Sequence, residues 1–127
     1  MIGLDLGTTN CKAVLLAADG RVRATASEGY KLQIPHPGWA EQDPRLVWAA
    51  AQKVLRAVAE VAAESDSLAA EGICISGAMH SLIPIGDEAG TPLANAMTWA
   101  DARATAVYRG LVADTDTHAL YRRTGCP

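Results

Sequence analysis

The sequence contains no apolar run that approaches the roughly 20 residues of a membrane-spanning helix. Asp5 also interrupts the stretch in which a secretory signal would place its apolar region. Basic residues are few, because 11 lysines and arginines stand against 14 acidic residues and the formal net charge is −3. A general binder of nucleic acid or anionic membranes would need a basic face. We therefore expect a cytoplasmic protein without nucleic-acid or membrane partners.

Cysteine is also scarce. The three cysteines, Cys11, Cys74 and Cys126, are odd in number and far apart, and none has the close spacing of zinc ligands. We expect three reduced thiols, and neither disulfides nor a zinc site. Internal repeats, low-complexity tracts and flexible linkers are absent as well, so the 127 residues are expected to form one domain.

Two common nucleotide-binding motifs are missing, namely Gly-x-x-x-x-Gly-Lys-Ser/Thr and Gly-x-Gly-x-x-Gly. The N-terminus carries instead an apolar strand, residues 2–6, that contains Asp5. Burying this carboxylate without a partner would be costly, so we expect it to meet a cation or a polar ligand. Phosphate-binding candidates follow the strand directly: Gly7, Thr8, Thr9, Asn10 and Lys12.

This turn has two interpretations. Its N–H groups, two hydroxyls and the ammonium of Lys12 are the donors that a polyphosphate needs, and Asp5 can hold Mg²⁺ through water. The alternative is a tight turn in which threonine hydroxyls satisfy the aspartate. The residue pattern by itself leaves both open.

The first half of the chain predicts an antiparallel meander followed by a helix. Residues 11–18 and 21–27 are strands, and Asp19-Gly20 between them is a strong hairpin signal. Asp43 is a good N-cap, and Pro44 suits the first helical position. Apolar residues then recur at helical spacing and are expected to face the core: Val47, Ala51, Val54, Val58 and Val61.

The second half predicts a buried strand over residues 71–76, which delivers residues 76–81 to its C-terminal end. Ligands collect at such ends in open α/β sheets. The remaining elements are expected to be short strands over residues 82–85 and 95–99, a turn at 87–90, and helices over 102–111 and 114–123.

Several side chains after these strands have both a structural and a functional interpretation. His80 can be tied to a neighbouring carbonyl, and the residues alone favour that role. Trp99, Asp101 and Arg103 form an aromatic face beside an acid and a base, which is typical of a carbohydrate surface, and Arg103 suits a carboxylate. Alternatively, Asp101 caps the following helix and Arg103 is solvated. We favour a ligand role for Trp99.

Residues 5–12, which read Asp-Leu-Gly-Thr-Thr-Asn-Cys-Lys, resemble the opening of the FGGY carbohydrate kinases, members of the actin-like ATPase superfamily. Further segments resemble the family in order and spacing, namely residues 37–44, 76–82 and 98–103. Ala-Met-His-Ser-Leu at 78–82 is most similar to the gluconokinases, whereas xylulokinases more often read Met-His-Gly there. Residues 120–127 also resemble the gluconokinase version.

The resemblance implies an α/β, ribonuclease-H-like fold, with an antiparallel meander and a mixed sheet flanked by helices. It implies ATP-dependent phosphorylation of a primary hydroxyl of a sugar or sugar acid, with gluconate favoured and a pentulose such as xylulose as the alternative. ATP and Mg²⁺ are the implied cofactors, with Asp5 anchoring the metal and the turn residues and Lys12 holding phosphates. The implied substrate contacts are Ala78, Met79, His80, Trp99, Asp101 and Arg103, with His80 orienting the polyol without serving as the base.

The resemblance also implies a longer protein. FGGY kinases are several times longer than 127 residues, and their catalytic Asp and most of their adenine-binding surface lie in the second half. We therefore expect residues 1–127 to be a partial N-terminal domain, inactive alone, whose exposed strand edges favour homo-oligomers. Other hypotheses are a non-catalytic sugar-binding module and a fragment without any activity.

The loop before the long helix lies near the sugar site in some members of the family. We expect Trp39 in this loop to serve packing. Glu41 and Gln42 have two open interpretations, since they either contact substrate or serve the helix N-terminus, where a negative charge complements the dipole.

Overall fold

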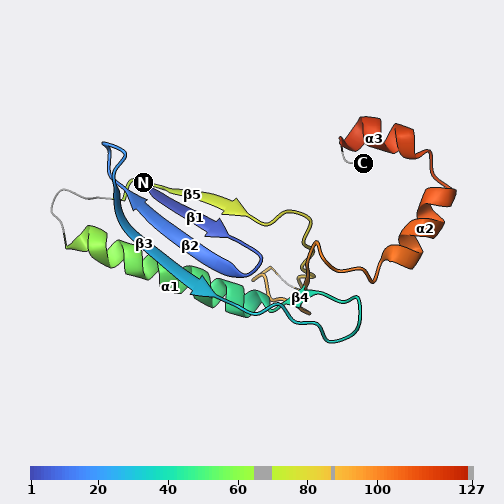
Figure 1. The fold of residues 1–127 in the computed structure, drawn as a ribbon, viewed down its shortest axis with the longest axis horizontal. Coiled ribbons are helices and arrows are strands. Elements are labelled where there is room, and N and C mark those ends of the chain that lie inside the picture. Colours follow the sequence, from blue (N-terminus) through green and yellow to red (C-terminus); the bar gives the residue numbers. More distant parts are fainter. Residues whose placement is uncertain (65–69, 87, 126–127) are drawn as a thin grey trace.

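The computed structural model describes residues 1–64, 70–86 and 88–125, and Figure 1 shows their arrangement. A four-stranded sheet has the order β3-β2-β1-β5, and a separate two-stranded sheet pairs β4 with β6. The strands are β1 (Ile2–Leu6), β2 (Asn10–Leu16), β3 (Val22–Gly29), β4 (Glu41–Gln42), β5 (Ile73–Gly77) and β6 (Ala96–Met97). The helices are α1 (Pro44–Ala63), α2 (Thr105–Ala113) and α3 (Thr117–Thr124).

The predicted meander is confirmed, because β1 and β3 both pair antiparallel with β2. The second hairpin closes where Asp19-Gly20 predicted it. The Ala17 N–H donates to the Arg21 carbonyl at 2.9 Å, and Gly20 has a φ of 81°, which glycine adopts without steric cost. Parallel pairing of β5 with β1 then makes the sheet mixed, which confirms the mixed sheet that the resemblance implied.

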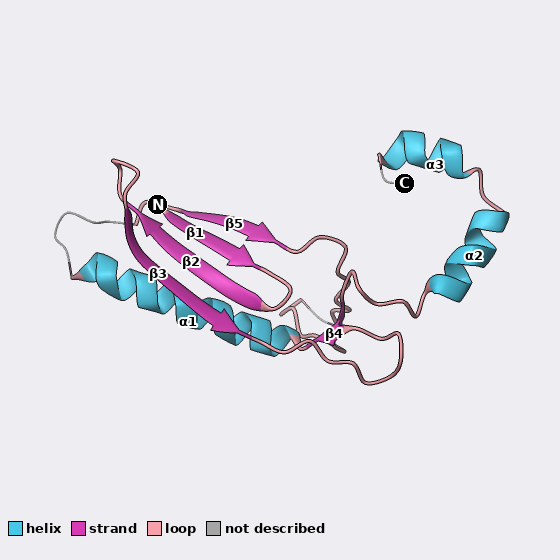
Figure 2. Ribbon diagram, viewed as in Figure 1, coloured by secondary structure: helices cyan, strands magenta, loops and turns pink. Residues whose placement is uncertain are grey.

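Helix α1 covers one face of the meander (Figure 2) and supplies five of the eleven buried residues of the core cluster. It begins as predicted, with the Asp43 carboxylate accepting the Arg45 N–H at 2.8 Å and Pro44 in the first position. Its most deeply buried side chains, Val54 and Val58, pack in the same cluster as Ile2, Leu4, Cys11 and Leu15.

The prediction for the end of this apolar stripe was wrong. Val61 is 37% exposed, and Ala62 is buried in its place. The buried positions in the second half of the helix are 54, 58 and 62, which advance in steps of four. Because such steps exceed the roughly 3.6 residues of one turn, the buried face rotates gradually around the helix axis. Val61 therefore lies beside the buried face and not within it.

The expectation of a buried strand over residues 71–76 was also wrong. Strand β5 forms there, but Ile73 is 53% exposed and Ile75 is 66% exposed. The cause is its position at the edge of the sheet, because α1 packs over β1, β2 and β3 and no described element covers β5. Cys74 is accordingly exposed, whereas Cys11 is buried; Cys126 lies outside the described residues.

The region after β5 has less regular structure than predicted. Only single bridges, Leu82 with Met97 and Ile85 with Pro92, stand where a strand over 82–85 was expected, and the later strand shrinks to β6. Glu88 and Ala89 form a turn, while residue 87 lies outside the described part of the chain.

The two C-terminal helices begin three residues later than predicted. Helices α2 and α3 have no buried residue and lie apart from the sheet in Figure 1, so among the described helices α1 alone covers the sheet. The N-cap of α3 is Asp116, whose carboxylate accepts the Ala119 N–H. Within the described residues, no helix combines the length and hydropathy needed to cross a bilayer.

We predict that Val58→Ala lowers the free energy of unfolding by about 2 kcal/mol, because it removes buried methyl groups and leaves a cavity. Val61→Ala is the matched control on the same helix, with an expected change below about 0.5 kcal/mol. Urea unfolding followed by circular dichroism measures both. An equal loss of unfolding free energy in the two variants would contradict the placement of Val61 outside the buried face.

Candidate functional site

The carboxyl ends of β1 and β5 lie side by side, because the two strands are parallel and Leu6 is in register with Gly77. The turn Gly7–Asn10 follows the first strand, and residues 78–80 follow the second. The Ala78 N–H donates to the Leu6 carbonyl at 2.9 Å, which ties the two exits together. The predicted phosphate turn and part of the predicted sugar segment are therefore neighbours.

Tyr30 holds the Gly7–Asn10 turn through contacts with its backbone carbonyls. Its hydroxyl lies 2.5 Å from the Gly7 carbonyl and 3.0 Å from the Asn10 carbonyl, and its N–H donates to the Thr9 carbonyl at 3.0 Å. Burial, together with the nearby Cys11 and Asp5, raises the pKa of Tyr30, so its hydroxyl stays a donor at neutral pH.

Position 7 has little room for a side chain. A Cβ there would come within 3.0 Å of the Asn10 carbonyl oxygen and 3.8 Å of the Asp5 carboxylate. The Gly7 N–H donates to the same Asn10 carbonyl at 3.0 Å and closes the turn. A larger residue at position 7 would therefore have to push the Asn10 carbonyl aside by a few tenths of an ångström.

Asp5 and Lys12 are cross-strand neighbours on the face of the sheet opposite α1, and both are exposed. Burial therefore does not force Asp5 to find a partner, contrary to the argument from its apolar surroundings. The two side chains line an open trough of about 670 Å³, together with residues of β3 and β5. The ammonium group of Lys12 and the carboxylate of Asp5 are thus both accessible beside the turn.

Thr8 accepts two contacts from the β4–β6 region, by which we mean β4, β6 and residues 98–103 that follow β6. The Gln42 side-chain amide donates to the Thr8 carbonyl, and the Trp99 indole N–H donates to the Thr8 hydroxyl at 3.4 Å. Trp99 is still 63% exposed, so much of its ring surface is open beside the turn. No sequence signal indicated the contact of Gln42, because it joins residues 34 positions apart.

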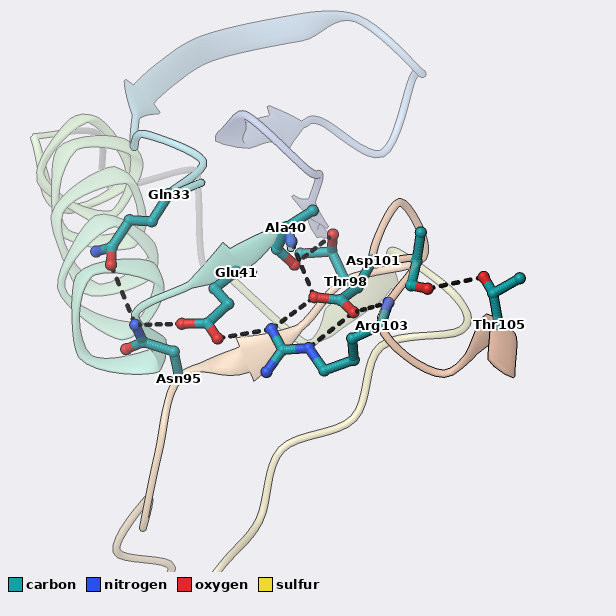
Figure 3. Close-up of polar contacts among 9 residues, drawn as sticks. Gln33, Ala40, Glu41, Asn95, Thr98, Asp101, Arg103 and Thr105 are labelled. Atoms are coloured by element: carbon teal, nitrogen blue, oxygen red, sulfur yellow. Dashed lines mark hydrogen bonds and ion pairs between the residues drawn. The ribbon is translucent and has the colours of Figure 1, made fainter. Parts of the chain in front are cut away.

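The β4–β6 region is held by Arg103 (Figure 3). Its guanidinium lies 2.6 Å from a Glu41 oxygen and donates to both Asp101 oxygens at 2.6 and 2.8 Å. Asp101 also accepts the Ala40 N–H at 2.8 Å. Arg103 stacks over Trp39 at 3.7 Å, and His36 meets the same ring edge-on, so Trp39 packs against this network; its packing role stays a prediction.

Hydrogen bonds in this network set the charges of its members. The Arg103 hydrogen bond holds the pKa of Asp101 well below its usual range. Hydrogen bonds from Arg103 and then Asn95 lower the pKa of Glu41. Asp101, and then Glu41, raise the pKa of Arg103. All three groups are therefore charged at neutral pH.

Two earlier interpretations of this segment were wrong. Asp101 does not cap the following helix, because α2 begins at Thr105 and its N-cap Ala104 has no side-chain cap. Arg103 is not a solvated side chain, since it is only 25% exposed and contacts two carboxylates. Whether either residue also contacts a ligand stays a prediction.

The remaining sugar-site candidates are open to solvent. Met79 is 74% exposed, and Ala78 and His80 are exposed beside it. His80 has a φ of 61°, a left-handed conformation that is uncommon for residues with a side chain. Within the described residues its ring has no hydrogen-bond partner, so the expected tie to a neighbouring carbonyl is not seen. Its substrate role stays a prediction.

We predict that the chain loses stability as the pH falls from about 5 to about 2, a range that starts just above the ordinary carboxyl pKa values and ends below them. Asp101 and Glu41 have lowered pKa values in the folded state, so the unfolded chain binds more protons in this range. Arg103→Gln should lower the melting temperature at pH 7 and flatten its pH dependence.

Lys53→Gln is the control for that measurement, because Lys53 also pairs with a carboxylate, Glu28, at 2.7 Å but is 68% exposed. Exposed pairs contribute little to stability. Melting curves of the three proteins between pH 2 and pH 8 give the test. A pH profile of Arg103→Gln that matches the unchanged chain would contradict the assignment.

The comparisons with known proteins cover the whole chain. Residues 1–127 match a family model described as the FGGY family of carbohydrate kinases, N-terminal domain. The gluconokinase of Bacillus subtilis (strain 168) is 37% identical over 127 residues, 100% of this chain and 24% of that protein. A xylulose kinase of Staphylococcus epidermidis (strain ATCC 12228 / FDA PCI 1200) is 38% identical over 103 residues, 81% of this chain and 20% of that protein.

Solved structures give the same answer. The gluconate kinase from Lactobacillus acidophilus matches with a TM-score of 0.87 and 35% identity, over 99% of this chain and 25% of that one. The chain spans about a quarter of the length of the relatives it matches. The match to the N-terminal domain model over every residue shows that the chain belongs to the FGGY family of carbohydrate kinases.

Proposed function

We propose that this chain is the N-terminal part of a longer, cytoplasmic ATP-dependent kinase that phosphorylates gluconate on a primary hydroxyl. The observation that carries the proposal is the meeting of three segments at one edge of the sheet. The Thr8 turn follows β1, Ala78 bonds to the end of β1, and Trp99 bonds to Thr8. Phosphoryl transfer needs such a meeting of phosphate and acceptor groups.

The sugar side of the proposed site consists of Trp99, Met79 and His80. The Trp99 indole N–H is directed at Thr8, so the exposed ring surface is what remains to stack on a sugar. The two nitrogens of the His80 ring can exchange hydrogen bonds with hydroxyls. Because Arg103 already contacts Asp101 and Glu41, its proposed part is to hold this side in place.

The phosphate side fits MgATP by the chemistry of its donors. Thr9 and Lys12 are exposed beside the turn, and one accessible carboxylate, Asp5, stands next to them. Mg²⁺ bound to nucleotide commonly takes one or two carboxylates and keeps several waters. Asp5 would hold such an ion through water, and Thr8, Thr9 and Lys12 would contact phosphate oxygens. The bound ion would offset charge on the transferred phosphoryl group.

A proton acceptor for the sugar hydroxyl is a separate requirement. Asp101 and Glu41 are poor acceptors because their pKa values are lowered by the contact with Arg103. The family resemblance implies an Asp from the part of the longer kinases that this chain does not span. Residues 1–127 alone are therefore expected to bind ligands without transferring phosphate.

The alternative substrate is a pentulose, which the 38% identity to a xylulose kinase supports. A chimera decides between them, with residues 1–127 replacing the matching quarter of the Bacillus subtilis gluconokinase. The proposal predicts ADP formation that depends on gluconate, with a kcat/KM at least tenfold above that for xylulose. Preference for xylulose would overturn the substrate, and sugar binding without turnover would favour a non-catalytic module.

In this chimera, Asp5→Asn should lower kcat about 100-fold or more, the usual loss for a group that stabilises transition-state charge. Gluconate affinity, measured by calorimetry, should stay within about twofold, because the sugar contacts lie on other residues. Asp19→Asn, at the exposed tip of the second hairpin, is the matched control. An active Asp5→Asn chimera would remove the residue from the proposed machinery.

A further inference from the structure

The four carbonyl oxygens of the turn all accept hydrogen bonds from the protein. Tyr30 contacts the carbonyls of Gly7, Thr9 and Asn10, and the Gly7 N–H also reaches Asn10. The remaining carbonyl, that of Thr8, accepts from the Gln42 side chain. Among these donors Gln42 is the one that comes from the β4–β6 sheet.

This arrangement matters for an anion. Carbonyl oxygens carry partial negative charge and repel phosphate, whereas N–H groups attract it. If a peptide unit rotates by half a turn, its C=O group takes the place of its N–H group. Donors that contact the carbonyl oxygens therefore fix the side of the turn on which these oxygens lie. Among the described residues, Gln42 alone supplies such a donor for the peptide between Thr8 and Thr9.

We propose that Gln42 is a positioning residue, which holds the Thr8 carbonyl away from the phosphates and joins the turn to the sugar-binding region. The inference rests on the proposed function, since it assigns the phosphates to this turn. Gln42 is only 7% exposed and therefore acts on a ligand through Thr8. Trp99 contacts the hydroxyl of the same threonine, so Thr8 is the shared residue of the two sides.

The first test uses the chain itself and needs no ligand. Gln42→Met keeps the shape of the side chain and removes the amide donor. Exchange of the Gly7 amide hydrogen, followed by NMR, should become about fivefold faster, the factor that one ordinary hydrogen bond provides. The Trp99 indole N–H resonance should shift as well. Gln33→Met is the matched control, since Gln33 contacts Asn95 and not the turn.

The second test uses the gluconokinase chimera. Gln42→Met should raise the KM for MgATP about tenfold and leave the KM for gluconate within about twofold. Gln42→Glu should raise the KM for MgATP further, because a carboxylate cannot donate and adds negative charge. Gln33→Met should leave both values unchanged.

The outcomes separate this proposal from the proposed function. Unchanged Gly7 exchange, faster exchange throughout the chain, or loss of cooperative unfolding in Gln42→Met would each overturn the positioning role. An equal rise of both KM values would do the same. A folded chimera without gluconate-dependent turnover would instead refute the proposed function and leave the exchange result standing.

Discussion

The contact of Arg103 with Glu41 and Asp101 is the interaction on which the candidate site depends. Strands β4 and β6 contain two residues each, and a ladder of that length is marginal without further support. Arg103 joins segments 62 positions apart, and its bidentate geometry with Asp101 is the stronger form of such a pair. Gln42 in this sheet and Trp99, two residues after β6, reach the turn.

The site is thus assembled from two separately supported parts. The hydrophobic core between α1 and the meander holds β1, and Tyr30 extends that support to the turn. The ion-pair network ties β4 to Asp101 and Arg103 in the segment that follows β6 and Trp99. Thr8 is where the two parts meet, through contacts to its carbonyl and its hydroxyl. Displacing either part would change the distance between the proposed phosphate and sugar groups.

Features that depend on local chemistry could be predicted from the sequence. Asp19-Gly20 predicted a hairpin, because glycine accepts a left-handed conformation, and Asp43-Pro44 predicted the start of α1 by capping. The turn at Gly7 was predicted as well. In each case the determining residues are neighbours in the chain.

Features that depend on distant neighbours could not be predicted. Strand β5 is exposed because α1 covers β1, β2 and β3 and does not extend over β5. The residues of β5 contain no signal for the position of α1. Arg103 was expected either at a ligand or in solvent, because its partner Glu41 belongs to a different segment. The role of Gln42 was left open for the same reason. The ligand roles of the exposed residues stay predictions, since exposure alone does not identify a ligand.

The most direct test of the account is an NMR titration of the chain with gluconate and, separately, with MgATP. The account places both ligands around Thr8. It therefore predicts that gluconate shifts the Trp99 indole and Thr8 resonances, that MgATP shifts the resonances of the turn and Lys12, and that Thr8 responds to both. Responses confined to separate regions without Thr8, or no response to either ligand, would contradict it.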